Sequence, residues 1–182
     1  MLNIGIDYSI SSPSVYIGGD DFNSGKVLCF RQNKKMESKD NVFMSDYPEY
    51  NSKEERYYKL ASVCVQFILD NTEHLDEKPY ILIEGYAYGA SGNVFDIAEA
   101  TSVIKQLLYH NGFDIKIVEP SVVKKKATGK GNSNKFGMLE AFTNLGYDIS
   151  TKFDNIAQIT DKKIPAPMTD IIDAYFVSRA LS

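Results

Sequence analysis

LNIGIDY, residues 2–8, alternates apolar side chains with small or polar ones. This period of two predicts a β-strand whose even-numbered residues share one face, with Gly5 and Asp7 on the other. Gly5 has no side chain, so it leaves room for a neighbour beside Asp7. The carboxylate of Asp7 could also simply cap the turn that follows. SVYIGG (14–19) and KVLCFRQ (26–32) predict two further strands, which together suggest an antiparallel meander.

The rest of the chain alternates between strand and helix patterns after an irregular insertion at about 32–51. The expected elements are a helix over 52–71, a strand over 80–84, a helix over 93–111, a strand over 113–119, and helices over 120–126, 134–145 and 168–182. This order predicts a single α/β domain over 1–182, with a mixed sheet of three antiparallel strands and then alternating strand and helix, flanked by helices. It is the element order of the ribonuclease H-like architecture.

The composition is that of an ordinary soluble domain, with 43% hydrophobic and 24% charged residues. No apolar run is long enough to span a membrane and the N-terminus lacks a secretory signal, so we expect a cytoplasmic protein. Cys29 and Cys64 stand far apart and are expected to be buried free thiols. The net charge of −4 argues against binding of nucleic acid, but residues 120–139 contain five lysines and no acid.

Two acids lie side by side on the last, mainly apolar helix. Asp170 and Asp173 are three residues apart, which places them on one side of that helix, at the start of the stripe expected to face inward. Buried together, two carboxylates repel each other and lose hydration unless a cation lies between them. The other interpretation is that both acids stabilise the helix dipole from its first turn.

Glu84 ends the apolar run YILIE (80–84), at the strand end where α/β proteins place a ligand crevice. A solvent-exposed strand end is the alternative. Together with Asp7, Asp170 and Asp173, it makes a set of four acids suited to Mg²⁺, or Mn²⁺ as a substitute. Such sets hold two ions about 4 Å apart, which activate water and stabilise the leaving oxygen of a phosphodiester.

Four motifs, GIDYS, LIEGYAYG, KKKATGKGNSNK and TDIIDAYFVSRA, occur in the order and approximate spacing of the RuvC-type Holliday-junction resolvases, and the chain resembles that family over nearly its whole length. The divergent first motif suggests a phage or distant member. The resemblance implies a homodimeric crossover junction endodeoxyribonuclease that acts in DNA recombination and repair by paired nicks in four-way junctions. Candidate dimer faces are the helical residues 57–68 and 94–108.

The resemblance also implies roles for individual residues. The family's metal-binding residues match Asp7, Glu84, Asp170 and Asp173. Lys135 matches a lysine near the scissile phosphate, and either Lys125 or Lys126 matches a second basic residue. Tyr86 and Tyr88 flank Ala87, the position nearest to the family's aromatic wedge, so the wedge is not assigned.

The lysine-rich segment and the two tyrosines are the candidate DNA contacts. Glycines between the lysines allow a close approach to phosphates, and Tyr86 and Tyr88 could stack on exposed bases. The alternatives are a solvated lysine run and core tyrosines. The candidate residues are Lys124, Lys125, Lys126, Lys130, Asn132, Ser133, Lys135, Tyr86 and Tyr88.

The sequence thus predicts metal-dependent hydrolysis of a phosphodiester. In this scheme Asp7 bridges two ions, Glu84 and Asp170 each complete one side, Asp173 holds the second ion, and Lys135 stabilises charge on the phosphate. The closest alternative is a ribonuclease H or a 3′–5′ exonuclease of the same fold. Other classes are an inactive DNA-binding relative and an actin-like kinase or ATPase, although the glycine-rich adenosine-binding segments of the latter are not recognisable here.

Overall fold

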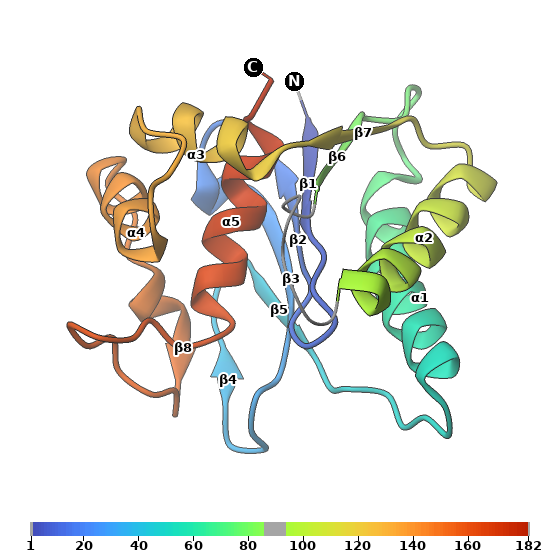
Figure 1. Cartoon of the computed structure of the whole chain (residues 1–182), viewed down its shortest axis with the longest axis horizontal. Coiled ribbons are helices and arrows are strands. Elements are labelled where there is room, and N and C mark those ends of the chain that lie inside the picture. The colour runs from blue at the N-terminus through green and yellow to red at the C-terminus, as the bar shows by residue number, and fades with distance from the viewer. Residues whose placement is uncertain (1, 86–93, 182) are drawn as a thin grey trace.

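A six-stranded mixed sheet forms the centre of the computed structural model, which describes residues 2–85 and 94–181 (Figure 1). The strand order is β5-β3-β2-β1-β6-β7. β1 (Asn3–Asp7), β2 (Ser14–Gly18) and β3 (Lys26–Phe30) are the predicted antiparallel meander, and β6 (Ile81–Glu84) and β7 (Ile115–Val118) follow parallel to β1. The predicted fold class is therefore confirmed.

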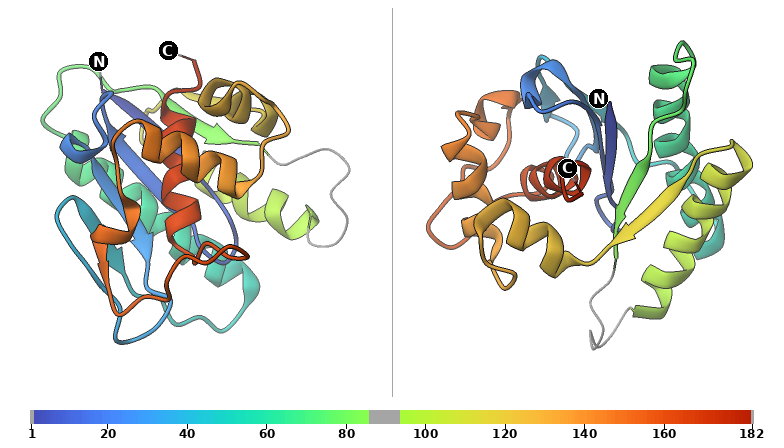
Figure 2. Two further views of the ribbon diagram at one scale, coloured as in Figure 1. Left: turned by 90° about the vertical axis from the view of Figure 1, so that its left-hand side faces the viewer. Right: turned by 90° about the horizontal axis from the view of Figure 1, so that it is seen from above.

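Helices cover both faces of the sheet. α1 (Lys53–Thr72) and α2 (Val94–His110) pack on one face, and α5 (Met168–Ser178) packs on the other. α3 (Pro120–Thr128) and α4 (Lys135–Asn144) lie against α5 on its far side from the sheet (Figure 2). α5 is thus enclosed between the sheet and a second helical layer. No described helix is both long and apolar enough to cross a bilayer.

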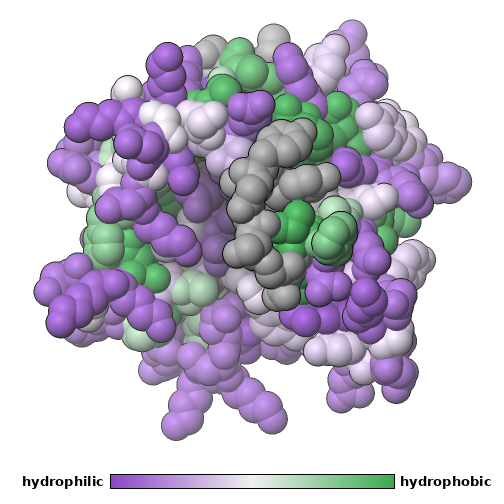
Figure 3. Space-filling view, viewed as in Figure 1, coloured by the Kyte–Doolittle hydropathy of each residue, from purple (hydrophilic) through white to green (hydrophobic). Residues whose placement is uncertain are grey.

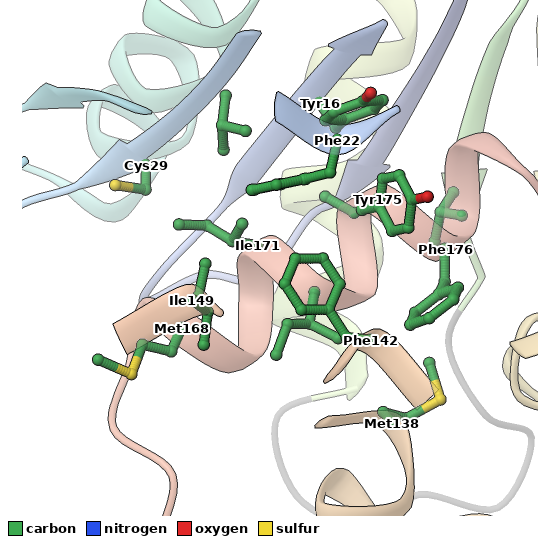
Figure 4. Packing of buried hydrophobic residues seen from close by; sticks show 14 of the residues in the cluster. Tyr16, Phe22, Cys29, Met138, Phe142, Ile149, Met168, Ile171, Tyr175 and Phe176 are labelled. Carbon is green, nitrogen blue, oxygen red and sulfur yellow. The ribbon is translucent and has the colours of Figure 1, made fainter. Parts of the chain in front are cut away.

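Each face of the sheet has its own apolar core. Ile4 and Ile6 of β1 lie in the core beneath α1 and α2, as the alternation predicts. The core around α5 is rich in aromatic residues (Figure 4). Phe22 and Phe142 meet edge to face at 4.8 Å between ring centroids, and Tyr175 meets Phe22 in the same way at 5.5 Å. Such pairs favour one orientation, so they help to fix α5 on the sheet.

The segment 32–51, expected to be an irregular insertion, contains two strands. β5 (Val42–Ser45) extends the sheet parallel to β3, and β4 (Glu37–Ser38) pairs with β8 (Phe153–Asp154). The sequence prediction was wrong here because β4 has only two residues and its partner lies more than 100 residues along the chain. Pairing of this kind leaves no local periodicity.

The end of the last helix also differs from the prediction. α5 ends at Ser178 and not at 182, and Ser178 is buried. Ser178 donates a hydrogen bond from its hydroxyl to the carbonyl of Tyr175 at 2.6 Å, so its polar group is satisfied without water. Both cysteines are buried and unbridged, as predicted.

Candidate active site

Gly5 allows the backbone of α5 to lie directly on β1. A Cβ atom at Gly5 would lie 2.1 Å from the carbonyl oxygen of Ala174 and 2.4 Å from the amide nitrogen of Ser178. Only glycine permits this approach, because every other residue would bring a carbon into those backbone atoms. The space predicted beside Asp7 is therefore occupied by a helix.

The same contact brings Asp170 and Asp173 to Asp7. Asp7 lies two residues beyond Gly5, about 7 Å further along the strand. Asp170 lies four residues before Ala174, about 6 Å back along α5. α5 runs antiparallel to β1. Going forward from Gly5 to Asp7 along the strand and backward from Ala174 to Asp170 along the helix therefore leads to the same place. The first turn of α5 therefore meets the carboxyl end of β1.

Glu84 reaches the same edge from the neighbouring strand. β6 lies parallel to β1 with Ile83 paired to Ile6. Glu84 and Asp7 are the next residues of these two strands, so they lie side by side at adjacent strand ends. Ile6 and Ile83 both face the α1–α2 core. The next residue of each strand therefore points to the opposite face, toward α5.

The four acids are half-buried, and their charges act on one another. Burial raises the pKa of Asp7 well above its usual value, and the charges of Asp170, Asp173 and Glu84 raise this pKa further. Burial followed by the charge of Asp170 raises the pKa of Asp173 to about 6, and burial followed by the charge of Asp173 raises that of Glu84 to about 7. Burial also raises the pKa of Asp170. All four predicted acids thus lie in one cluster.

Two lysines border this acid cluster. Lys135 begins α4 just after Asn134, whose side chain caps the helix by accepting from the amide of Gly137 at 3.0 Å. The charge of Lys135 partly offsets the rise in the pKa of Asp7, Asp170 and Asp173. The charge of Lys124 partly offsets the rise in the pKa of Glu84 and Asp173.

Lys124 is the lysine of α3 whose charge lowers the pKa of Glu84 and Asp173. The assignment of Lys125 or Lys126 as the second basic residue, which the resemblance implies, stays a prediction. Three consecutive lysines point in three directions around a helix, and only the packing of α3 decides which of them faces the acids.

Ser12, Gln32 and Tyr47 form a hydrogen-bonded set that reaches Asp170 through Ser12, and no sequence pattern indicates it. The buried hydroxyl of Ser12 lies close enough to lower the pKa of Asp170. Gln32 donates from its amide nitrogen to the hydroxyl of Tyr47 at 2.9 Å and to that of Ser12 at 3.4 Å. These residues come from the β1–β2 turn and the ends of β3 and β5. Nothing in their sequence spacing indicates this meeting.

The chemistry of the acid cluster fits a hard divalent cation. All four side chains offer carboxylate oxygens, and Oδ2 of Asp170 is buried without a hydrogen-bond partner. A buried oxygen of this kind is costly unless a cation or water satisfies it. Within residues 2–85 and 94–181, however, no three acid, histidine or cysteine side chains stand ready to hold one ion. The carboxylates would have to turn toward a shared ion.

The remaining candidates are spread over the lysine-rich segment. Lys125, Lys130 and Asn132 are exposed there, and Ser133 is half-buried. Lys126, Lys130 and Ser133 line a separate groove between α3, α4 and α5. Tyr86 and Tyr88 lie outside the described residues.

The raised pKa values predict that stability without metal falls as pH rises. An acid whose pKa is higher in the folded than in the unfolded chain keeps its proton longer when folded, so deprotonation favours unfolding. We expect Tm to fall by about 5–10 °C between pH 4 and pH 8, mostly between the unfolded-state pKa values of about 4 and the folded-state values of about 6 for Asp173 and about 7 for Glu84. Thermal unfolding in chelator would measure this, and Mg²⁺ at pH 8 should recover the loss. A Tm that rises steadily over this range would contradict the expectation.

Comparison with known proteins agrees with the architecture. No protein-family model and no curated protein matches the chain. Among solved structures, RuvC of Thermus thermophilus superposes with a TM-score of 0.60 at 13% identity, over 99% of this chain and 94% of that one. T. thermophilus RuvC in complex with a Holliday junction substrate superposes with a TM-score of 0.59 at 13% identity, over 97% of this chain and 92% of that one. The chain therefore has a RuvC-like fold.

Proposed function

We propose that this protein is a metal-dependent endonuclease that resolves four-way DNA junctions by hydrolysing phosphodiester bonds. The observation that carries the proposal is the half-buried cluster of Asp7, Glu84, Asp170 and Asp173, with Lys124 and Lys135 beside it. The RuvC-like fold supports it, since one of the similar structures is a complex with a Holliday junction substrate.

The four acids would hold two divalent ions, Mg²⁺ or Mn²⁺. When bound, these ions supply an activated water and stabilise the leaving oxygen. Asp7 would be a central ligand, because the charges of all three other acids act on its pKa. Glu84, Asp170 and Asp173 would supply the remaining carboxylate ligands. Two ions would balance the formal charge of −4, so the chain's acidity and its metal site would have one origin.

The lysines would act on the substrate. A phosphodiester brought to four carboxylates is repelled by their charge, and a cation at the rim offsets that repulsion. Lys135 is exposed and lies within electrostatic reach of three of the acids, so it suits contact with the scissile phosphate as negative charge builds up in the transition state.

The direct test compares cleavage of a synthetic mobile four-way junction, a linear duplex, an RNA–DNA hybrid and a single strand, each with Mg²⁺ and with chelator. We expect paired, symmetric nicks in the junction that require metal. Preference for the hybrid would favour the ribonuclease H alternative. Equal cutting of all four substrates would reject junction selectivity.

Replacing Lys135 by Ala should slow cleavage of saturating junction about 100-fold, because a cation beside the reacting phosphate is lost. The control is Lys105→Ala, which removes a lysine on α2, across the sheet from the acids. Single-turnover rates with Mg²⁺ measure the effect. Equal rates for the two variants would remove Lys135 from the proposed mechanism.

Paired nicks need two active sites, and each chain supplies one, so we propose that the protein acts as a homodimer. α1 and α2 are the candidate faces. Tyr58 on α1 is 56% exposed and Tyr109 on α2 is 60% exposed. Each helix thus presents a large aromatic side chain that a second subunit could cover. Light scattering after size exclusion would report the mass, and a monomer that persists with junction bound would contradict this part.

A further inference from the structure

The turn between β1 and β2, residues 8–13, follows the acid at the end of β1 and is held by several hydrogen bonds. Within the turn, the amide of Ser12 donates to the hydroxyl of Ser9 at 2.9 Å. From outside, the hydroxyl of Tyr47 donates to the carbonyl of Ser11. Ser12 itself is buried. Its hydroxyl is therefore kept in one place and away from bulk water.

The strand β5 brings Tyr47 to this turn. β5 lies parallel to β3, and its last residue, Ser45, accepts from the amide of Arg31 at 2.9 Å. Two residues later the ring of Tyr47 packs on the ring of Phe30, with 5.2 Å between their centroids. The segment 32–51, whose role the sequence leaves open, thus places a tyrosine hydroxyl at the turn between β1 and β2.

Gln32 connects Tyr47 with Ser12. Its amide nitrogen donates to the carbonyl of Phe30 at 3.1 Å and to the hydroxyl of Tyr47 at 2.9 Å. The same nitrogen donates to the hydroxyl of Ser12 at 3.4 Å. Two hydrogens serve three acceptors, so the longest bond, to Ser12, is the weakest. Because the oxygen of Ser12 accepts from Gln32, its own hydrogen is available for Asp170.

The two oxygens of Asp170 have different surroundings. Oδ1 accepts from the hydroxyl of Thr169 at 3.3 Å, whereas Oδ2 is buried and has no hydrogen-bond partner among the described residues. Burial raises the pKa of Asp170, and a hydrogen bond with Ser12 opposes this rise more than the charge of Lys135 does. Ser12 is therefore the contact that most favours the charged carboxylate, the form that binds a cation.

The three polar residues differ in their access to water. Gln32 is exposed, Tyr47 is half-buried and Ser12 is buried. Hydrophilic residues predominate over the side of the molecule that carries α5, with small apolar patches among them (Figure 3). Water can replace a hydrogen bond that is lost at the surface, but it cannot do so at a buried hydroxyl. The buried end of the set should therefore matter most.

We propose that Ser12 is a positioning residue for Asp170 and that Tyr47, brought by β5, keeps Ser12 in place. The hydrogen bond sets the orientation of a carboxylate ligand before an ion binds, which reduces the entropy lost on binding. The proposal rests on the proposed function for the identity of the metal site. Ser12 and Tyr47 act through Asp170 and take no part in hydrolysis.

Calorimetric titration of the protein with Mn²⁺, without DNA, tests the proposal. Ser12→Ala removes only a hydroxyl and should weaken Mn²⁺ binding about 10-fold. Tyr47→Phe keeps the ring on Phe30 and should weaken binding about 3-fold, as expected for one indirect hydrogen bond. The matched control is Tyr147→Phe. It removes the hydroxyl of another half-buried tyrosine, which donates to the carbonyl of Asp20 at 3.4 Å, and should leave the affinity unchanged.

The same changes in an Asp170→Asn background separate positioning from general damage to the fold. If Ser12 and Tyr47 act through the carboxylate of Asp170, Ser12→Ala and Tyr47→Phe should change Mn²⁺ affinity by less than about 2-fold once that carboxylate is absent. Losses of equal size in both backgrounds would show that Ser12 only supports the fold. Unchanged affinity of Ser12→Ala with Asp170 present would also overturn the proposal.

Cleavage of the four-way junction gives a second readout. Ser12→Ala should raise the Mg²⁺ concentration for half-maximal cleavage about 10-fold, while the rate at saturating Mg²⁺ stays within about 3-fold. A rate that stays far lower at saturating Mg²⁺ would contradict a positioning role. If the unmodified protein binds Mn²⁺ but fails to cleave, the proposed function fails, while the titrations still decide the role of Ser12. Absence of Mn²⁺ binding by the unmodified protein would overturn both.

Discussion

Asp7→Asn is expected to reduce junction cleavage by about 1,000-fold or more, while junction binding stays within a few-fold of the unmodified protein. Asp7 lies beside the acids of β6 and α5 and would be a central ligand of the metal ions. Losing it should remove several kcal/mol of transition-state stabilisation, and each 1.4 kcal/mol is about tenfold in rate. The substitution keeps the size and shape of the side chain. DNA contacts through the lysines should therefore persist.

The same variant should be more stable than the unmodified protein when metal is absent. The pKa of Asp7 is raised by burial and by three other acids, so its charge at neutral pH opposes folding. Asn removes that charge. We expect a higher Tm in chelator and a smaller gain of Tm on adding Mg²⁺. Raised stability with lost activity is the usual signature of a functional site built at the expense of stability.

The two measurements are single-turnover cleavage with Mg²⁺ and thermal unfolding with chelator and with metal. Asp76→Asn, which changes an exposed acid after α1, is the matched control and should alter neither. Cleavage by Asp7→Asn at the unmodified rate would exclude Asp7 from metal binding. A lower Tm in chelator would contradict the electrostatic account of the cluster.

Gly5→Ala is expected to give the largest loss of stability of any single methyl addition in β1. The new carbon would lie 2.1 Å from the carbonyl oxygen of Ala174, a backbone atom that cannot rotate away. Either α5 moves off the sheet or the strand bends. We expect a loss of about 3 kcal/mol or more in the free energy of unfolding. Any protein that still folds should cleave poorly, because the shift separates Asp170 and Asp173 from Asp7.

Gly137→Ala on α4 is the matched control. The nearest atom to its new methyl group is Oγ of Ser133, at 2.2 Å, which belongs to a short side chain that can rotate. Alanine also has the higher helix propensity, so stability should change by less than about 1 kcal/mol. Denaturant unfolding of both variants measures the difference. If Gly5→Ala proves as stable as Gly137→Ala, the direct packing of α5 on β1 is incorrect.

Much of the fold could be predicted, because its elements carry local periodicity. The alternation of residues 2–8 and the apolar run of 80–84 fix where two parallel strands end, and parallel strands end at one edge of a sheet. That rule alone predicts that Asp7 and Glu84 lie at the same edge of the sheet. β5 and β4 could not be predicted, since short strands in a polar segment are stabilised by distant partners and show no clear pattern.

The sequence by itself determined which side chains are candidates for the chemistry: acids at two strand ends and on one face of the last helix, with a lysine-rich segment between them along the chain. Periods of 2.0 and 3.6 residues follow from backbone geometry, so they can be read without a folded chain. Only the tertiary structure decided that Lys124 borders the acids, that Ser12 lies beside Asp170, and that Lys126 and Lys130 line a second groove. These outcomes depend on how α5 packs on Gly5 and how α3 and α4 pack on α5. Contacts of that kind join residues far apart in sequence, and their energies exist only once the chain has folded.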